Sequence, residues 1–261
     1  MPYSGVGRIR TRDNPKNTTS RFQKVFDNTY SSTEECYHER KKMKTDAKLI
    51  IFSAGLFLLL LSTFAYADAD WAYKSRYGVS FPVVDKWEGS VISELRYKDD
   101  MSDHYYSHLE VVLGYDFLEW LEIGTNYRYI SRVTDDGWKR ENRPSVYAEL
   151  KWNWSDFEFS DNNKLEYRIR EDNEDIFRYK NKLKVEYPVE WTKLKISPYA
   201  SEEIFCDFDV GQLNGYRLEA GFSMQLIKNS ELCIAYQFGN DKKSNGWTDT
   251  NYLVTYLKIS F

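Results

Sequence analysis

The sequence predicts an all-β protein, a transmembrane antiparallel β-barrel of ten to twelve strands in the outer membrane of a Gram-negative bacterium. An apolar export segment precedes a long region in which apolar and polar residues alternate. Mean hydropathy is only −0.65, although 17% of the residues are aromatic. A barrel that turns aromatic and apolar side chains outward and polar side chains inward has this composition. A soluble β-sandwich, which also alternates, is the alternative.

Residues 1–42 are polar and lack apolar periodicity, so we interpret them as a non-structural leader or a mis-assigned start. A genuine cytoplasmic extension is the alternative. Residues 43–67 are predicted to be a signal peptide, with lysines before an apolar core and Ala65-Tyr66-Ala67 as the cleavage motif. The apolar run is short for a membrane span, which disfavours a signal anchor. Cleavage leaves residues 68–261 as the barrel.

After the predicted cut, 25 basic and 34 acidic residues remain, and this acidic balance disfavours nucleic acid as a partner. Cys206 and Cys233 fall on strands that are not neighbours in the expected order, so two free thiols are expected. No glycine-rich phosphate loop, CxxC motif or nucleophile elbow occurs, and we predict no cofactor.

Alternation and turn residues divide the exported region into strand-like segments. In residues 216–226, for example, apolar side chains occupy every even position. Polar connections at 99–103, 132–143, 172–175 and 240–249 alternate with short turns, which is typical of outer loops and periplasmic turns. We expect strands at residues 71–81, 88–98, 104–116, 121–131, 144–154, 157–171, 176–187, 193–205, 213–226, 230–239 and 250–261.

The last segment has apolar residues at alternate positions back from Phe261, and it resembles the signal that outer-membrane barrels present to their assembly machinery. Tryptophans near the short turns, at positions 87, 120, 152, 154 and 191, indicate an interfacial girdle. Ten strands counted back from Phe261 form an even barrel of a monomeric, lipid-embedded protein. Residues 71–81 then lie in the lumen or along the rim, or they pair with an undetected twelfth strand.

The expected inward face is heavily charged, and charges that meet inside a narrow barrel must pair or stay hydrated. Two interpretations remain open: a salt-bridged structural lumen, or a narrow pore or anion site. The second uses a basic ladder on two adjacent strands, formed by Lys164, Arg168, Arg170, Arg178, Lys180, Lys182 and Lys184. Arg217, Glu94, Arg96, Glu166 and Glu219 are expected to line the same lumen.

An outer-membrane lipid hydrolase (a phospholipase or lipid A deacylase) is the alternative function, because enzymes in such barrels use Ser and His. His104 and His108 are expected on one lumenal face, and neither has a serine two residues later, as the known phospholipases do. Asp99 and Asp103 with the two histidines are weak metal-ligand candidates whose spacing matches no metal motif.

The chain resembles the outer-membrane proteins grouped as domain of unknown function 2490. The resemblance spans residues 71–261 and rests on short motifs in a fixed order. They are Glu94-Leu95-Arg96-Tyr97 with Asp99-Asp100-Met101-Ser102-Asp103, Leu165-Glu166-Tyr167-Arg168, Phe177-Arg178-Tyr179-Lys180-Asn181, Pro198-Tyr199 with Glu203, and Tyr216-Arg217 with Gly221. The resemblance implies an outer-membrane barrel and supplies no activity, so no catalytic residue is assigned.

Overall fold

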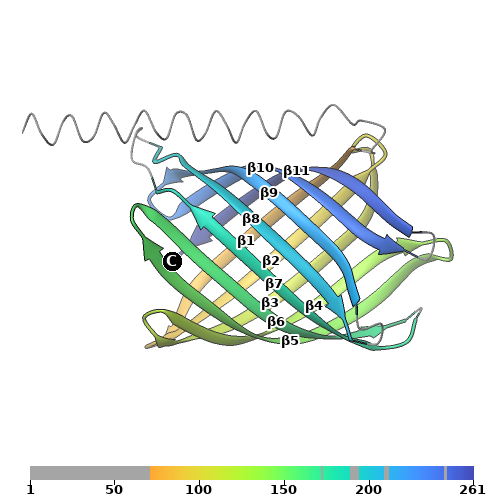
Figure 1. Ribbon diagram of the computed structural model, residues 1–261, viewed down its shortest axis with the longest axis horizontal. Helices are drawn as coiled ribbons and strands as arrows, with labels where there is room; N and C mark the ends of the chain where they lie inside the picture. Colours follow the sequence, from red (N-terminus) through yellow and green to blue (C-terminus); the bar gives the residue numbers. More distant parts are fainter. Residues whose placement is uncertain (1–70, 172, 189–193, 209–211, 244–245) are drawn as a thin grey trace, which may run out of the picture. The chain divides into compact units, whose positions relative to one another are not determined.

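The structure is a computed structural model that describes residues 71–261 apart from 172, 189–193, 209–211 and 244–245. This part of the chain forms eleven strands that close into one barrel (Figure 1). No helix among the described residues is long and apolar enough to cross a membrane. The predicted leader and signal peptide lie outside the described residues.

The strands are β1 (Trp71–Val84), β2 (Trp87–Lys98), β3 (Asp103–Leu118), β4 (Leu121–Thr134), β5 (Gly137–Trp154), β6 (Phe157–Arg170), β7 (Ile176–Glu186), β8 (Ser197–Asp207), β9 (Gln212–Ile227), β10 (Ser230–Lys243) and β11 (Gly246–Ser260).

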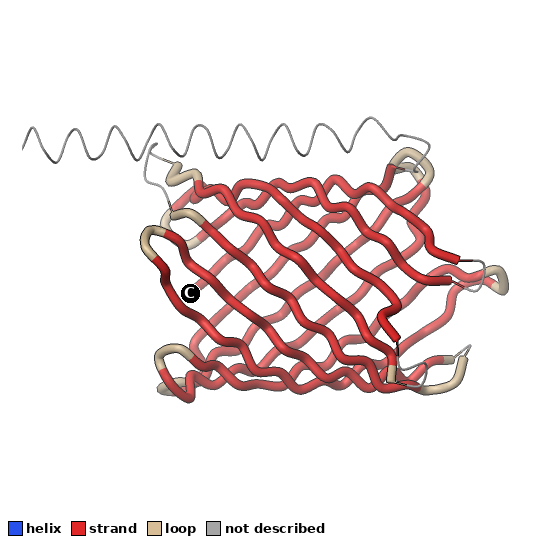
Figure 2. Tube along the Cα trace, viewed as in Figure 1, coloured by secondary structure: helices blue, strands red, loops and turns tan. Residues whose placement is uncertain are grey.

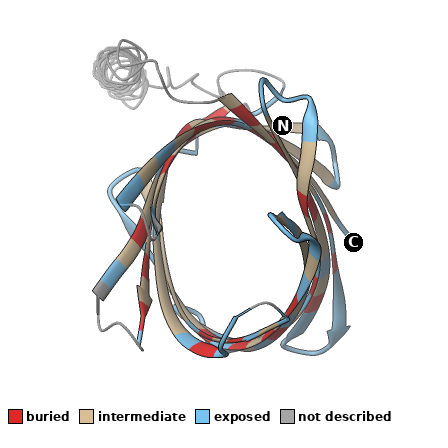
Figure 3. Ribbon diagram, turned by 90° about the vertical axis from the view of Figure 1, so that its right-hand side faces the viewer, coloured by how far each residue is buried: buried red, intermediate tan, exposed pale blue. Residues whose placement is uncertain are grey.

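Each strand pairs antiparallel with the next along the chain, and the strands are inclined to the barrel axis (Figure 2). Because side chains alternate across a strand, one face of every strand meets lipid and the other meets the lumen. On β9, Leu218 and Phe222 face outward and are 47% and 45% exposed. On β6, the lumenal Glu166 is fully buried. The predicted transmembrane barrel and its two faces are therefore confirmed, and Figure 3 shows the closed ring of strands.

β1 closes the barrel by running parallel to β11, from Trp71 opposite Asn251 to Ser80 opposite Ser260. The backbone N–H of Phe261 continues this seam by donating to the carbonyl of Ser80 at 3.0 Å. The expectation that residues 71–81 lie in the lumen or on the rim, or need a twelfth strand, is wrong. An antiparallel ring requires an even number of strands, but one parallel pair lets eleven strands close without leaving an open edge in lipid.

The connections also differ from the expected pattern of short turns opposite long loops. The strands run on through residues 132–143 and 240–249, so that β4–β5 and β10–β11 are joined by only residues 135–136 and 244–245. Gly137 and Gly246 follow these turns with φ values of 97° and 119°, a conformation that glycine adopts without strain. We name the end holding these turns the N-terminal rim, because β1 begins toward it, and the end holding Phe261 the C-terminal rim.

Aromatic side chains gather toward both rims on the lipid side, as a membrane barrel requires. At the C-terminal rim, Trp152 stacks on Phe159 with ring centroids 5.3 Å apart, and Trp87 lies 4.9 Å from Tyr115. Trp120 occupies the turn between β3 and β4. These positions agree with the predicted girdle, apart from residue 191, which lies outside the described residues.

Cys206 and Cys233 are free, as expected, and β9 separates their strands.

The parallel seam predicts a specific disulfide. In a chain whose native cysteines are replaced by serine, Ser75→Cys with Thr255→Cys should form a β1–β11 cross-link on mild oxidation, because these residues are paired in register. Non-reducing electrophoresis of the folded protein measures the yield. Ser75→Cys with Leu95→Cys, which are paired across β1 and β2, is the positive control. A cross-link in the control alone would disprove the seam.

A charged lumen as the candidate functional site

All twelve side chains that alternation predicts to line the lumen face it. Ten of them line two adjoining cavities inside the barrel. The other two, Lys164 and Lys184, reach lumenal carboxylates of Glu110 and Glu186 at 3.6 and 2.5 Å. The ten are Arg168, Arg170, Arg178, Lys180, Lys182, Arg217, Glu94, Arg96, Glu166 and Glu219. Their placement follows from the two-residue period, which needs no knowledge of tertiary structure.

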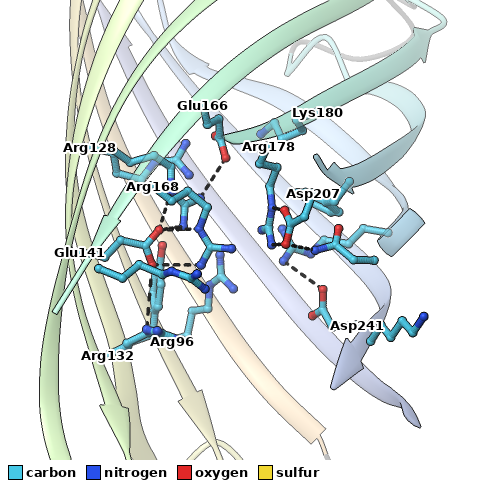
Figure 4. Close-up of a pocket in the computed structure, with 17 residues that line it drawn as sticks. Arg96, Arg128, Arg132, Glu141, Glu166, Arg168, Arg178, Lys180, Asp207 and Asp241 are labelled. Carbon is cyan, nitrogen blue, oxygen red and sulfur yellow. Dashed lines mark hydrogen bonds and ion pairs between the residues drawn. The ribbon is translucent and has the colours of Figure 1, made fainter. Parts of the chain in front are cut away.

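Glu141 on β5 organises the charges nearest the N-terminal rim (Figure 4). Its carboxylate is 1% exposed and accepts hydrogen bonds from Arg143 Nη2 at 2.6 Å and Arg168 Nε at 2.6 Å. Arg143 Nη1 also donates to Glu166 at 3.1 Å. Bidentate arginine–carboxylate contacts of this kind compensate the desolvation of each charge. Arg132 Nε on β4 also lies 3.9 Å from Glu141, so three arginines and two glutamates from β4, β5 and β6 form one ionic cluster.

Glu110 on β3 is the centre of a second ionic group, farther from the N-terminal rim than Glu141. It accepts hydrogen bonds from Arg128 Nη2 at 2.7 Å and Nε at 3.1 Å, and from Asn126 Nδ2 at 2.7 Å. Lys164 Nζ lies 3.6 Å from the same carboxylate. Three strands thus contribute to one ionic group, because their side chains converge in a narrow lumen. This arrangement ties β3, β4 and β6 together on the inside.

The β7 part of the basic ladder is paired as well. Arg178 donates to both carboxylate oxygens of Asp207, at 2.5 and 3.0 Å. Glu203 lies between Lys180 Nζ, at 2.8 Å, and Arg217 Nη1, at 3.2 Å. Lys182 differs, because it makes no ion pair or hydrogen bond with a described residue. The β7 part of the ladder is therefore largely paired. Lys182 lies opposite Glu203 in register but beyond ion-pairing distance, so Glu203 compensates its charge only at longer range.

Aromatic rings hold the cations on the opposite wall. Lys74 Nζ lies 4.6 Å from the ring centre of Tyr252, and the Arg76 guanidinium lies 4.8 Å from that of Tyr256. Arg76 also reaches the carboxylate of Glu94 at 3.1 Å. A ring face attracts a cation and shields it without adding negative charge. This wall keeps its positive charge while restricting the movement of the side chains.

Several important lumenal residues were not predicted from the sequence. The region 132–143 was expected to be an outer loop, and a strand was expected to end at residue 205, so their charges were left outside the barrel. The polar alternation does continue through both regions, and that was the available signal. Pro144, where a strand was expected to start, lies inside β5 and interrupts its pairing with β6. The residues missed in these two regions are Arg132, Glu141, Arg143 and Asp207. Lys74 and Arg76 were missed because residues 71–81 were not assigned to the barrel wall.

The lumen contains a wide cavity toward the N-terminal rim and a narrow one beyond it. The wide cavity has a volume of about 370 Å³ and is lined by ten basic and four acidic side chains. The narrow cavity, about 70 Å³, is lined by seven lysines and arginines, His108 and three glutamates. Arg96, Arg128, Lys180 and Arg217 belong to both walls, so the cavities adjoin at this level. Positive charge exceeds negative charge in both.

A layer of tyrosines separates the narrow cavity from a third cavity, of about 510 Å³, at the C-terminal rim. Tyr199 and Tyr256 line the narrow cavity, while residues two positions away on the same faces, Ser197 and Lys258, line the third. A side chain at Gly78 would collide with the Tyr256 hydroxyl, since a Cβ there would lie 2.5 Å from it. The glycine therefore makes room for this tyrosine across the seam.

His104 and His108 do not share a face, contrary to expectation. A bulge in β3 shifts the register between Arg96 and Tyr97, and it pairs Tyr97 with His104 on the lipid side. The His104 ring lies 5.3 Å from Tyr97 and 5.2 Å from Trp138, within the aromatic girdle. His108 stays in the lumen, with Nδ1 3.2 Å from the Tyr106 hydroxyl. Among the described residues, neither imidazole is hydrogen-bonded to a serine.

The weak metal-ligand candidates do not converge on one point. Asp99 and Asp103 lie 3.8 and 3.6 Å from the ammonium of Lys98 at the rim. His104 Nε2 is 3.1 Å from the Tyr106 carbonyl oxygen. Within the described part of the chain, no three His, Cys, Asp or Glu side chains gather as a metal site would require.

The fold and the lumen define a transmembrane β-barrel of the outer-membrane type with a charged, largely ion-paired interior. The family model described as "Protein of unknown function (DUF2490)" matches residues 73–250, and the chain belongs to this family. The resemblance seen in the short motifs is thereby confirmed. No curated protein matches the chain.

Two solved structures match part of the chain at low identity. One is an anion-selective porin from Comamonas acidovorans, with 12% identity and a TM-score of 0.36, covering 68% of this chain and 53% of the porin. The other is the β domain of the Bordetella autotransporter BrkA, with 11% identity and a TM-score of 0.35, covering 65% of this chain and 82% of that domain. The chain spans about half the length of the porin.

Removing the charge of Glu141 should destabilise the barrel. Glu141→Gln leaves two buried arginines without their shared carboxylate, and breaking such a pair costs about 3 kcal/mol. Urea unfolding in phospholipid vesicles measures the loss. Glu119→Gln, in the exposed turn between β3 and β4, is the control and should unfold like the unmodified protein. Equal stability of both variants would show that the ionic cluster does not hold the wall together.

Proposed function

We propose that the protein is a narrow outer-membrane pore that favours small anions. The excess of basic over acidic side chains along two adjoining cavities is the observation that supports this function. Fixed positive charge in a confined aqueous path raises the local concentration of anions and lowers that of cations. The bound carboxylates offset only part of that charge, so a positive field remains along the path.

The narrowest part of the path is the level at which selection would occur. Lys182 and Arg76 both line the 70 Å³ cavity, and Lys182 has no carboxylate at ion-pairing distance among the described residues. A volume of this size admits a few waters or a small ion, not a sugar or a peptide. We infer that conduction depends on small movements of Tyr199 and Tyr256, which border the cavity on the side of the C-terminal rim.

The proposal includes the route to the membrane. Residues 43–67 would direct export and be removed, and the strand ending in Phe261 would be recognised by the barrel assembly machinery. The C-terminal rim would then face the periplasm.

A silent, folded barrel would favour the other interpretation of the lumen, a structural barrel whose charges fill it. The lipid-hydrolase alternative gains no support from the positions of the two imidazoles.

The selectivity proposal predicts an effect of Lys182→Gln in planar bilayers. Reversal potentials in a potassium chloride gradient should show chloride preferred over potassium in the unmodified protein. A unit charge about 6 Å from an ion in water contributes roughly 0.7 kcal/mol, so the variant should lower this preference about two- to threefold. Lys86→Gln, in the exposed turn between β1 and β2, should have no effect. Cation preference, or an unchanged ratio in Lys182→Gln, would contradict the proposal.

The tyrosine layer makes a separate prediction about conductance. Tyr256→Ala removes a ring that borders the narrow cavity, and single-channel conductance should rise while the preference for chloride persists. Tyr127→Ala, a matched change on the lipid-facing side of β4, serves as the control. If Tyr256→Ala conducts no better than the control, the tyrosine layer does not limit the path.

A further inference from the structure

The lipid-facing surface of β6, β7 and β8 carries two carboxylates and two amides, Asp161, Glu202, Asn163 and Asn181, next to exposed apolar residues. Register places Asp161 opposite Leu183, and Leu183 opposite Glu202, so these carboxylates share the outward face with an exposed leucine. On the described strands, Asp161 and Glu202 are the carboxylates that face outward away from both rims. A charged or amide group that faces hydrocarbon is costly, so its retention needs an explanation.

A hydrogen-bonded network joins this patch together. The Asn181 amide donates to Asp161 and to Asn163 Oδ1, the latter at 3.1 Å. The Tyr179 hydroxyl donates to the same Asn163 oxygen at 2.5 Å, and Asn163 Nδ2 reaches Asp161 at 3.3 Å. Asn163 and Asn181 are paired in register, and flanking residues on both sides are apolar. We name Asp161, Asn163, Tyr179 and Asn181 the amide patch.

The amide patch is not saturated by its own contacts. Asn181 Oδ1 accepts no hydrogen bond from a described residue, and Asn163 Nδ2 makes only the long contacts to Asp161. On adjacent strands of the lipid-facing surface, Asn181 Oδ1 is thus an acceptor without a hydrogen bond, and Asn163 Nδ2 is a donor with only long hydrogen bonds. An amide pair with a spare donor on one residue and a spare acceptor on the other is self-complementary under a two-fold rotation.

From this geometry we infer that the amide patch is the interface between two copies of this chain in the membrane. A two-fold axis along the membrane normal, between β6 and β7, sets Asn163 of each copy opposite Asn181 of the other. The same axis sets β8 against β5, so Glu202 meets the region of Ala148 and not a second Glu202. Small side chains permit close approach of two membrane surfaces. The inference is independent of the proposed transport function and replaces the monomer expected from the sequence.

Cross-linking in outer membranes tests this interface in the full chain with its three cysteines replaced by serine. Leu183→Cys lies beside the amide patch and leaves it intact, and a short bis-maleimide should convert this variant to covalent dimers. Val111→Cys is the matched control, because it is equally lipid-facing but on β3. Similar yields for the two variants, or a product joining the chain to a different protein, would overturn the inference.

A second variant separates association from folding. Asn163→Leu with Asn181→Leu in the Leu183→Cys chain removes the complementary amides and leaves Asp161 and Tyr179 in place. The barrel should remain folded, as judged by its heat-dependent electrophoretic shift, while dimer yield falls at least fivefold. Unchanged dimer yield in this folded variant would show that the amides do not form the contact.

Discussion

The absence of hydrogen-bonding partners in lipid is the constraint on which the whole barrel depends. Every strand edge within the membrane must be paired by another strand, because hydrocarbon satisfies neither N–H nor C=O groups. Eleven strands meet this demand through the parallel pairing of β1 with β11. Closure then sets the remaining features, since it separates one lipid-facing surface from one lumen and decides which side chains meet inside.

A lumen of this width makes charge pairing a geometric necessity. Side chains of Glu110, Glu141 and Glu203 each meet cations from more than one strand, so the ionic groups act as internal ties between strands. Pairing does not cancel the charge, because lysines and arginines outnumber carboxylates around both central cavities. One set of residues thus combines two roles: holding the wall together and giving the interior its positive field.

The sequence predicted the strands and their faces because a two-residue period is local information. The side chains of the basic ladder share the lumenal faces of β6 and β7 for the same reason. Three features lay outside that information: the parallel seam, which depends on residues at opposite ends of the barrel sequence; the bulge that turns His104 toward lipid; and the partners of Arg168 and Arg178. Glu141 and Asp207 were missed because polar strand ends were taken for loops, although the period continues through them.

The seam also determines the order in which the barrel can assemble. Ten of its strand pairs join neighbours in the chain and can form one after another as hairpins. The eleventh joins residues as far apart as Tyr73 and Thr255, which are separated by 182 positions and hydrogen-bonded at 2.7 Å. Contacts of such sequence separation form late, because the intervening chain must be ordered first. Until then, β1 and β11 both present open edges, so the inserting protein passes through a stage at which its two terminal strands must be kept apart from other chains.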